Sequence, residues 1–506
     1  MLFKSSSSAL TGIEAYVVEV EVDISAGLPN FIIVGLPDAS VRESKERVKA
    51  ALKNCGYEFP ARKVIINLAP ADRRKEGPAF DLSIALGHLA YLGIVPEESS
   101  RDFLFLGELA LDGRLKPIKG SLSAALLARK KGFKGIVVPK ANEKEAALVA
   151  GLDVFGLENL VRVVEFLTAP GKITPCRYSL ADLLVRPADE PDFCDVKGQH
   201  HVKRALEVAA AGSHNVLLVG PPGAGKTMLA RRIPSILPDM SFEETIEVTQ
   251  IYSAAGLLKD RGAVARRPFR SPHHTVTDAG LIGGGVVPRP GEVSLAHHGV
   301  LFLDELPEFR RKVLEDLRQP VEDGRITVSR VSMSVTFPSS FMLVAAMNPC
   351  EDAFRGLGPV REDCTDSQRI RYYSKISGPL LDRIDIQVEV PGVKFQDIVS
   401  KAEGESSAAI RSRIIRARQR QLERFAGRRI YANAQMGPKE TKAFCRIGRE
   451  GERLLEAAVN KLGFSARAYD RSLKVARTIA DLAGEEEIST AHLSEAIQYR
   501  LMDRYY

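Results

Sequence analysis

Apolar and polar residues alternate along residues 15–24, AYVVEVEVDI, with the period of a strand that buries one face. Residues 39–56 instead repeat at helical spacing, and Gly56 marks the predicted end of that helix. Apolar runs that end in Gly or Pro, such as FIIVGLP and GIVVPK, are typical of buried strands. The pattern predicts an α/β or α+β domain over residues 1–170 and a polar, proline-containing linker over 171–192.

The pattern changes after the predicted linker. Apolar strands, loops and helices follow one another over residues 193–393, in the order typical of a parallel α/β sheet. Residues 394–506 are largely helical in their spacing. We therefore expect three folded parts, which agrees with a length of 506 residues, since single cores rarely grow far beyond about 200 residues.

Composition places the chain among ordinary globular proteins, with 45% apolar and 27% charged residues. No apolar run approaches the ~18 residues that a membrane span requires, and the first ten residues lack a signal-peptide core. Six scattered cysteines are typical of a reducing compartment rather than of a disulfide framework. We therefore predict a cytoplasmic protein with no membrane partner.

The net charge of +7 is concentrated at the carboxyl end. Residues 401–506 hold 21 Lys and Arg against 14 Asp and Glu, so the rest of the chain is balanced. Such an excess favours an anionic partner, either a nucleotide or a nucleic acid. A solvated helical surface would have the same composition, and the sequence leaves both open.

The strongest chemical signal lies in NVLLVGPPGAGKTMLARRI, where an apolar strand at 215–219 leads into a glycine-rich loop and then a helix. This is the context of a P-loop, whose backbone N–H groups enclose phosphates at the positive end of a helix. Lys226 is predicted to reach the β- and γ-phosphates, and the Thr227 hydroxyl to bind Mg²⁺. The predicted cofactors are therefore ATP and Mg²⁺. The predicted nucleotide-binding residues are Gly220, Pro221, Pro222, Gly223, Ala224, Gly225, Lys226 and Thr227.

Two further strands carry polar residues at their carboxyl ends, where α/β sheets bind ligands. GVLFLDEL places Asp304 and Glu305 after a buried strand, as in a Walker B motif. We expect Asp304 to hold Mg²⁺ and Glu305 to orient the attacking water, and an acidic helix start is the alternative. FMLVAAMNP places Asn348 at the end of another strand, as a sensor of the γ-phosphate or as a turn residue before Pro349.

Arg383 lies in SGPLLDRIDI, at the edge of the predicted ATPase core. An arginine there fits a finger that stabilises the charge developing on the nucleotide of a neighbouring subunit. The alternative is an ion pair within its own chain, with Asp382 or Asp385.

The order of these motifs resembles that of AAA+ ATPases. RPFRSPHHTVTDAGLIGGG, PRPGEVSLAHHGVLFLDELPEF and RQPVEDGRITVSR are similar to the magnesium-chelatase-type branch, and nearly the whole chain resembles the ComM/YifB family of competence-associated ATPases. The resemblance implies a Lon-protease-like α/β domain at 1–170, an AAA+ P-loop α/β core at 193–393 and a C-terminal helical lid at 394–506. It also implies a homo-hexameric, ATP-driven DNA helicase that promotes branch migration on single-stranded and branched DNA during natural transformation.

The resemblance places a sensor arginine in FSARAYDRSLKVARTIADL, at 464–482. Arg467 is the first candidate for contacting the γ-phosphate, and Arg471 is its competitor. Helical spacing puts both arginines and Lys474 on one face and an apolar stripe on another. A plain surface charge is the alternative.

DNA contacts are predicted at a β-hairpin, GRITVSRVSMSVTF, which in related helicases points into the central channel of the ring. Arg330 near its tip and Arg325 on the same hairpin are candidate phosphate contacts without base specificity. The glycine-rich loop at 280–285 is a second candidate for the channel. One helical face carries four further arginines, which either DNA or solvent could cover: Arg413, Arg416, Arg420 and Arg424.

Histidine and cysteine pairs raise the question of a metal. The adjacent histidines at 273–274 and at 297–298 would point to opposite sides of a strand and chelate poorly, so structural or ring-interface roles are expected. Many members of the family carry four cysteines where this chain has Cys350, Cys364 and acidic residues. Two thiolates with carboxylates are atypical of structural zinc, so we expect no zinc there, with mixed ligation as the alternative.

The loop RRKEGPAFDLS, at 73–83, and the segment 115–146 resemble the nucleophile loop and the tail of the Lon-type peptidase fold. Those peptidases pair a serine with a lysine that activates its hydroxyl. Here Ala79 fills the first position, and the second falls near Leu122. We therefore predict a domain without peptidase activity that helps ring assembly or guides DNA.

Two other functions remain as alternatives. A chelatase-type motor would remodel a protein partner for metal insertion, and such motor subunits are expected to lack a Lon-like domain. An ATP-dependent protease is disfavoured by Ala79 and Leu122. All three share P-loop chemistry, so stimulation of ATP hydrolysis by DNA is the discriminating observation.

Overall fold

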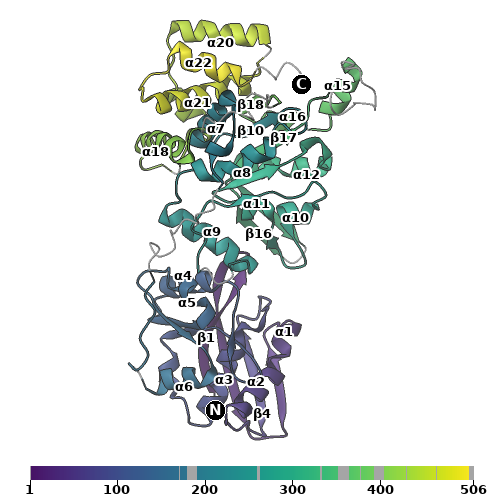
Figure 1. The fold of residues 1–506 in the computed structure, drawn as a ribbon. Coiled ribbons are helices and arrows are strands. Elements are labelled where there is room, and N and C mark those ends of the chain that lie inside the picture. The colour runs from purple at the N-terminus through teal and green to yellow at the C-terminus, as the bar shows by residue number, and fades with distance from the viewer. Residues whose placement is uncertain are drawn as a thin grey trace. The chain divides into compact units, whose positions relative to one another are not determined.

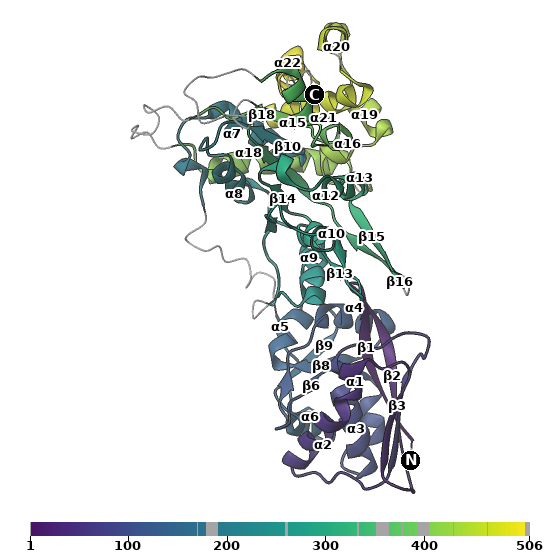
Figure 2. The same cartoon turned by 90° about the vertical axis from the view of Figure 1, so that its right-hand side faces the viewer.

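The structure, a computed structural model, forms two compact units, each described here by itself (Figures 1 and 2). The first contains Met1–Val185 and Ser241–Ala265, and the second contains Arg186–Met240 and Arg266–Tyr506. Most of the predicted linker and the predicted boundary at 393 lie outside the described residues, and the domain boundaries stay predictions. The described residues are 2–169, 171–178, 191–258, 262–330, 333–350, 364–376, 378–392, 404–428, 430–462 and 464–500.

A mixed seven-stranded sheet organises the first unit. Its strands are β1 Leu2–Thr11, β2 Glu14–Ser25, β3 Asn30–Val34, β4 Lys63–Ala69, β5 Phe103–Phe105, β8 Gly135–Pro139 and β9 Asp153–Leu157. They lie in the order β3-β4-β2-β1-β5-β8-β9, antiparallel between β1, β2 and β4 and parallel elsewhere. Val18, Val20 and Val22 on β2 are buried while their neighbours are more exposed, which confirms the predicted strand at 15–24.

Helices cover both faces of this sheet. Along β8, Val137 belongs to one apolar core, while Ile136 and Val138 belong to the core on the other face. Besides a small hairpin of β6 Glu108–Leu109 and β7 Leu115–Lys116, the unit contains helices α1 Ala39–Arg42, α2 Ser44–Asn54, α3 Asp81–Tyr91, α4 Ser121–Lys131, α5 Glu143–Ala146, α6 Leu160–Thr168 and α9 Phe242–Ala255. The last helix comes from the part of the sequence assigned to the ATPase core, and the spacing of its residues did not predict its place in the first unit.

A parallel five-stranded sheet forms the centre of the second unit. Its strands are β10 Val216–Val219, β11 Phe269–Arg270, β14 Val300–Leu303, β17 Met342–Met347 and β18 Ile386–Glu389. They lie in the order β11-β14-β17-β10-β18. Strands β10, β14 and β17 are buried at every position, as expected for a parallel sheet with helices on both faces. Because all five strands run the same way, the loops that follow them meet at one edge.

Helices and two short hairpins complete this unit, and the carboxyl-terminal helices gather at one end of it (Figure 1). Its helices are α7 His200–Gly212, α8 Lys226–Ile236, α10 Asp278–Ile282, α11 Glu292–Leu295, α12 Arg311–Asp316, α13 Arg318–Asp323, α15 Asp366–Tyr373, α16 Gly378–Leu381, α18 Ser407–Arg424, α19 Pro438–Phe444, α20 Arg449–Leu462, α21 Ala466–Ala483 and α22 Thr490–Gln498. One apolar core joins the sheet to α18, α21 and α22, so the helical lid packs directly on the ATPase fold. Among the described residues, no helix has both the length and the apolar character that crossing a membrane demands.

Candidate nucleotide site

The glycine-rich loop lies between β10 and the amino end of α8. Gly223 and Gly225 have φ of 78° and 88°, which residues with a Cβ rarely adopt, and a Cβ on Gly220 would lie 2.1 Å from the carbonyl oxygen of Val390. The Lys226 ammonium donates to the carbonyl oxygen of Gly220 at 2.6 Å and to that of Pro221 at 3.0 Å. The loop thus holds the lysine at the helix end where a P-loop binds phosphate.

Three neighbouring strands bring the other predicted residues to this lysine. The Lys226 ammonium also donates to Asn348 Oδ1 at 2.9 Å, because Asn348 directly follows β17, the neighbour of β10. The Thr227 hydroxyl donates to Asp304 Oδ2 at 2.6 Å, because Asp304 directly follows β14. A hydroxyl and a carboxylate are oxygen ligands of the type that Mg²⁺ prefers. The residues present therefore fit a nucleotide phosphate with its Mg²⁺.

Glu305 follows Asp304 in a left-handed conformation, with φ of 53°, and its side chain is 59% exposed. One carboxylate oxygen lies 3.4 Å from Nδ1 of His274. His274 reaches this place because β11 runs parallel to β14, so the residues after both strands lie at the same edge. Sequence reasoning missed this contact and assigned the histidine pair a structural or interface role. The sequence carried no usable signal for this contact, because the strand that precedes the pair, β11, has only two residues.

Comparison with known proteins gives the same picture. Family models match residues 192–398 ("Magnesium chelatase, subunit ChlI"), 20–142 ("Subunit ChlI of Mg-chelatase") and 404–500 ("Magnesium chelatase, subunit ChlI C-terminal"). Competence protein ComM of Haemophilus influenzae is 43% identical over 502 residues, which cover 98% of this chain and 97% of that protein. The chain belongs to the ComM/YifB family.

Two further relatives extend the comparison. YifB of Escherichia coli is 44% identical over 501 residues, which cover 98% of this chain and 96% of that protein. Lon protease 2 of Bacillus subtilis is 30% identical over 156 residues, or 29% of this chain and 28% of that protein. These relatives and the structure confirm the predicted fold class, a Lon-like α/β part with an AAA+-type α/β core and a carboxyl-terminal helical region. Membership of this family is consistent with an AAA+ ATPase.

In this family member the predicted finger, Arg383, is paired within its own chain. It is 8% exposed, forms an ion pair with Glu322 and donates to the carbonyl oxygen of Pro379 at 2.6 Å. The sequence had offered Asp382 or Asp385 as partners, and the structure selects neither. The guanidinium lowers the pKa of Glu322 because it stabilises the ionised carboxylate.

The two sensor candidates of this family member differ in burial. Arg467 is 60% exposed and lies 3.6 Å from a carboxylate oxygen of Asp382. Arg471 is 20% exposed and pairs with the buried Asp385. Burial alone would raise the pKa of Asp385, but the charge of Arg471, the His214 ring and a backbone N–H outweigh it and hold that pKa well below its ordinary value. Arg471 therefore has a structural partner, and Arg467 keeps the exposed guanidinium that contact with a phosphate requires.

The predicted DNA-binding hairpin is present as β15 Arg325–Arg330 and β16 Met333–Pro338. Its turn, 331–332, lies outside the described residues. Arg330 stands at the turn end and donates from Nε to the carbonyl oxygen of Gly285 at 3.4 Å, while exposed Arg325 stands at the other end. A Cβ on Gly284 would lie 3.0 Å from the Arg330 guanidinium. The segment 280–285, predicted as a loop, instead ends helix α10 at Ile282 and continues as β12 Gly283–Gly284, which pairs with β13 Arg289–Pro290. The structure thus brings together the hairpin and this glycine-rich segment.

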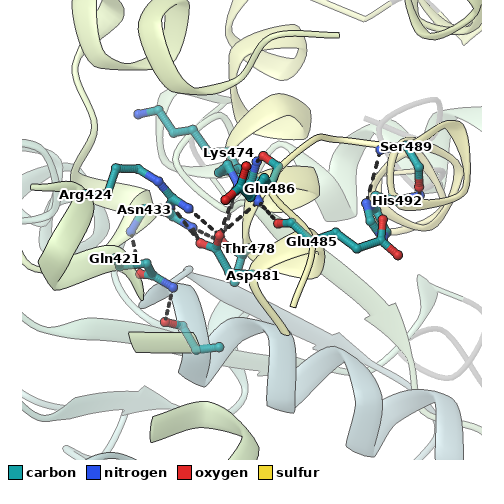
Figure 3. Close-up of polar contacts among 12 residues, drawn as sticks. Gln421, Arg424, Asn433, Lys474, Thr478, Asp481, Glu485, Glu486, Ser489 and His492 are labelled. Carbon is teal, nitrogen blue, oxygen red and sulfur yellow. Dashed lines mark hydrogen bonds and ion pairs between the residues drawn. The ribbon is translucent and has the colours of Figure 1, made fainter. Parts of the chain in front are cut away.

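The arginine stripe on α18 is not uniformly solvated. Arg413 forms ion pairs with two glutamates, and Arg424 binds the fully buried Asp481 (Figure 3). Of the four arginines, Arg416 and Arg420 are exposed enough to contact either DNA or solvent.

The remaining histidine and cysteine pairs have structural partners. His297 is 4% exposed, and its Nδ1 accepts the backbone N–H of Ser340 at 3.0 Å. Cys350 and Cys364 form a disulfide, with their Cα atoms 6.3 Å apart. The scattered cysteines had predicted no disulfide framework, but this pair is joined because the fold places side by side two cysteines that lie 14 residues apart in the sequence. Residues 351–363, which contain the acidic positions, lie outside the described residues.

The first unit lacks the peptidase chemistry of its Lon-type relatives at the two predicted positions. Ala79 and Leu122 belong to one apolar cluster, and Leu122 is completely buried. The nearby Ser83 is also buried, and its hydroxyl donates to the carbonyl oxygen of Phe105 at 3.3 Å. The methyl group of alanine cannot attack a carbonyl carbon, and the isobutyl group of leucine cannot accept the proton of a nucleophilic hydroxyl.

Proposed function

We propose that this protein is a Mg²⁺-dependent ATPase that works as a hexameric ring and moves single-stranded or branched DNA, promoting branch migration. The observation that carries the ATPase part is the convergence of Lys226, Thr227, Asp304 and Asn348 at one edge of the parallel sheet. Motor proteins of this type hydrolyse ATP by positioning and charge stabilisation rather than by covalent chemistry. The arrangement supplies both.

Each side chain has a defined task in this proposal. The Lys226 ammonium donates its hydrogen bonds to two backbone carbonyl oxygens and to Asn348 Oδ1. When ATP binds, these N–H donors would turn to phosphate oxygens. Thr227 and Asp304 would hold Mg²⁺, which neutralises the charge that develops on the phosphates. Glu305 would orient the attacking water, and the Asn348 amide would contact the γ-phosphate or that water as a sensor.

The DNA part of the proposal is supported by charge and by loop geometry. The carboxyl-terminal fifth of the chain carries the net positive charge, which attracts a phosphate backbone irrespective of sequence. Arg330 lies against Gly284 and Gly285, so one strand of DNA could contact a guanidinium and glycine backbone at the same place. The relative from Haemophilus influenzae is named a competence protein, which supports a role for this chain in competence.

The decisive experiment measures ATP hydrolysis with and without forked DNA, together with migration of a mobile four-way junction. Glu305→Gln should lower kcat by about 10²- to 10⁴-fold while nucleotide binding persists, because only the group that orients water is lost. Glu315→Gln, on an exposed carboxylate that pairs with Arg311, is the matched control and should be unaffected. Hydrolysis that DNA fails to stimulate, with no junction migration, would refute the helicase; hydrolysis that survives in Glu305→Gln would refute the site.

A chelatase-type motor acting on a protein partner is the second candidate, and the family models favour keeping it. The model that matches 20–142 carries a chelatase subunit's name, so the first unit does not separate the two functions as the sequence had led us to expect. ATP hydrolysis that ignores DNA but responds to a protein partner would select this candidate. Degradation of casein that stops in Glu305→Gln would instead revive the protease, against the apolar packing of Ala79 and Leu122.

A further inference from the structure

Helix α9 belongs by sequence to the ATPase and by packing to the first unit. Only residues 237–240 separate the end of α8, the helix that begins with Lys226, from Ser241, which caps α9. Yet α9 is grouped with the first unit, where it packs against α4. Five of its side chains are buried: Thr245, Val248, Thr249, Ile251 and Ser253. A helix buried to this extent moves with the unit that surrounds it.

The surface that holds α9 contains the two positions at which the resemblance to Lon-type peptidases places a catalytic pair. Ala79 and Leu122 belong to the apolar cluster against which Ile246 of α9 packs. Both positions carry apolar side chains, and their cluster packs against Ile246. The buried side of α9 is mixed, with Val248 and Ile251 beside hydroxyl-bearing residues.

A buried carboxylate fastens the same contact. Glu145 is 5% exposed, and its Oε1 accepts both the backbone N–H of Leu122 at 2.9 Å and the hydroxyl of Ser253. The carbonyl oxygen of Ser253 accepts the N–H of Gly120 at 3.3 Å, and Gln250 Nε2 donates to the carbonyl oxygen of Ile13 at 2.9 Å. These bonds are made at a water-excluded surface, where leaving them unmade would cost about 1–3 kcal/mol each. The docking of α9 is therefore specific as well as apolar.

In the second unit, Arg267 lies just after the segment that returns from α9 and binds the segment that leads into α9. Arg267 donates to the carbonyl oxygens of Pro238 at 2.7 Å and Asp239 at 3.3 Å, just before α9 in the sequence. It also donates to the carbonyl oxygen of His298 at 2.8 Å, two residues before β14 begins. β14 carries Asp304 at its other end, so Arg267 links both connections of α9 to the strand that leads to the predicted metal ligand.

We infer that α9 is a transmission helix: the degenerate peptidase surface holds it, and the Arg267 clamp connects it to α8 and β14. The five Cα–Cα steps from Ile236 to Ser241 span at most about 18 Å when fully extended, and the Arg267 contacts with Pro238 and Asp239 restrict this connection further. Nucleotide-dependent movement of α8 or β14 is therefore passed to α9 and to the first unit. The inference requires ATP binding at Lys226, but not the proposed DNA activity.

Hydrogen exchange of the full chain tests the inference, in the Glu305→Gln variant with and without ATP and Mg²⁺. Peptides from the P-loop report ATP binding, and peptides from α9 and α4 report transmission. We expect exchange in α9 and α4 to change by about 5- to 150-fold, the usual range of coupling between sites. Arg267→Ala should abolish the change in α9 and α4 and leave the protection of the P-loop, whereas Arg311→Ala, at an exposed ion pair, should keep both.

Each result decides the inference. Protection of the P-loop without any change in α9 or α4 would overturn it, even if Arg267→Ala fails to fold, because that comparison uses only the Glu305→Gln variant. If exchange in α9 and α4 responds to ATP equally in Arg267→Ala, the role inferred for Arg267 would be refuted. Absence of P-loop protection would instead refute the proposed ATP site, so the two failures are distinguishable.

Discussion

Replacing Asp481 by asparagine removes the central charge of a buried ionic network that joins α18 and α21 of the lid (Figure 3). The Asp481 side chain is 0% exposed, and its Oδ2 accepts Arg424 Nη1 at 2.9 Å and Asn433 Nδ2 at 2.8 Å. Its Oδ1 accepts Arg477 Nε at 3.1 Å, and that guanidinium is 3% exposed. Asp481→Asn keeps the shape but leaves two largely buried cations without their counter-charge. Removing one partner of such a buried pair costs about 3–5 kcal/mol.

Urea unfolding measures this loss, and hydrogen exchange of α21 identifies which transition moves, since a chain with two units need not unfold in one step. With an m-value near 3 kcal/mol/M, the midpoint should fall by about 1 M or more. Arg416→Ala, on the exposed part of the same α18 stripe, is the control and should stay within about 0.5 kcal/mol of wild type. A loss below about 1 kcal/mol for Asp481→Asn would refute the network, and Arg424 would return to the candidates for DNA contact.

Two further predictions concern the ATPase core. His274→Ala should lower kcat about tenfold or more and leave KM nearly unchanged, because the Glu305 carboxylate loses the neighbour that positions it. Misplacement of a catalytic group costs up to about 10²-fold in rate. His273→Ala is the control and should retain activity, and an effect of His274→Ala on KM alone would contradict the assignment. Asp385 has a pKa that folding lowers, so its contribution to stability is present above the pKa of the unfolded chain, near 3.9, and is lost as pH falls toward the pKa of the folded chain. The difference in unfolding free energy between wild type and Asp385→Asn should therefore be full at pH 7 and shrink steadily below about pH 4. A difference that does not change with pH would contradict the pairing with Arg471.

The nucleotide site was predictable because its geometry is local. Strand, loop and helix are contiguous in the P-loop, and Asp304 and Asn348 each follow a buried strand directly. Once the strands are parallel, their carboxyl ends must meet, so four side chains scattered over more than a hundred residues converge. His274 escaped this reasoning because β11 has only two residues, too short for an apolar pattern to mark it.

Helix α9 and the arginine partners could not be predicted for a different reason. The sequence of α9 identifies neither its buried side, which includes three Ser and Thr residues, nor the surface that buries it, and the sequence order favoured its own neighbours. Arg383 likewise has two acidic neighbours in the sequence, yet it pairs with Glu322, because the fold brings α13 beside the guanidinium. Choice among carboxylates is set by tertiary packing, which no local pattern encodes.

The pairing of Arg383 bears on its predicted role across a subunit interface, which stays a prediction. The Glu322 side chain is 58% exposed, whereas the Arg383 side chain is only 9% exposed and also donates to the carbonyl oxygen of Pro379. Among the described residues the Arg383 Nε finds no hydrogen-bond acceptor, although it is buried. To reach a neighbouring nucleotide, the guanidinium would exchange Glu322 and the Pro379 carbonyl oxygen for a triphosphate, which offers it more charge and bidentate geometry. The intrachain pair is therefore compatible with a finger that turns outward when a neighbouring subunit presents its nucleotide.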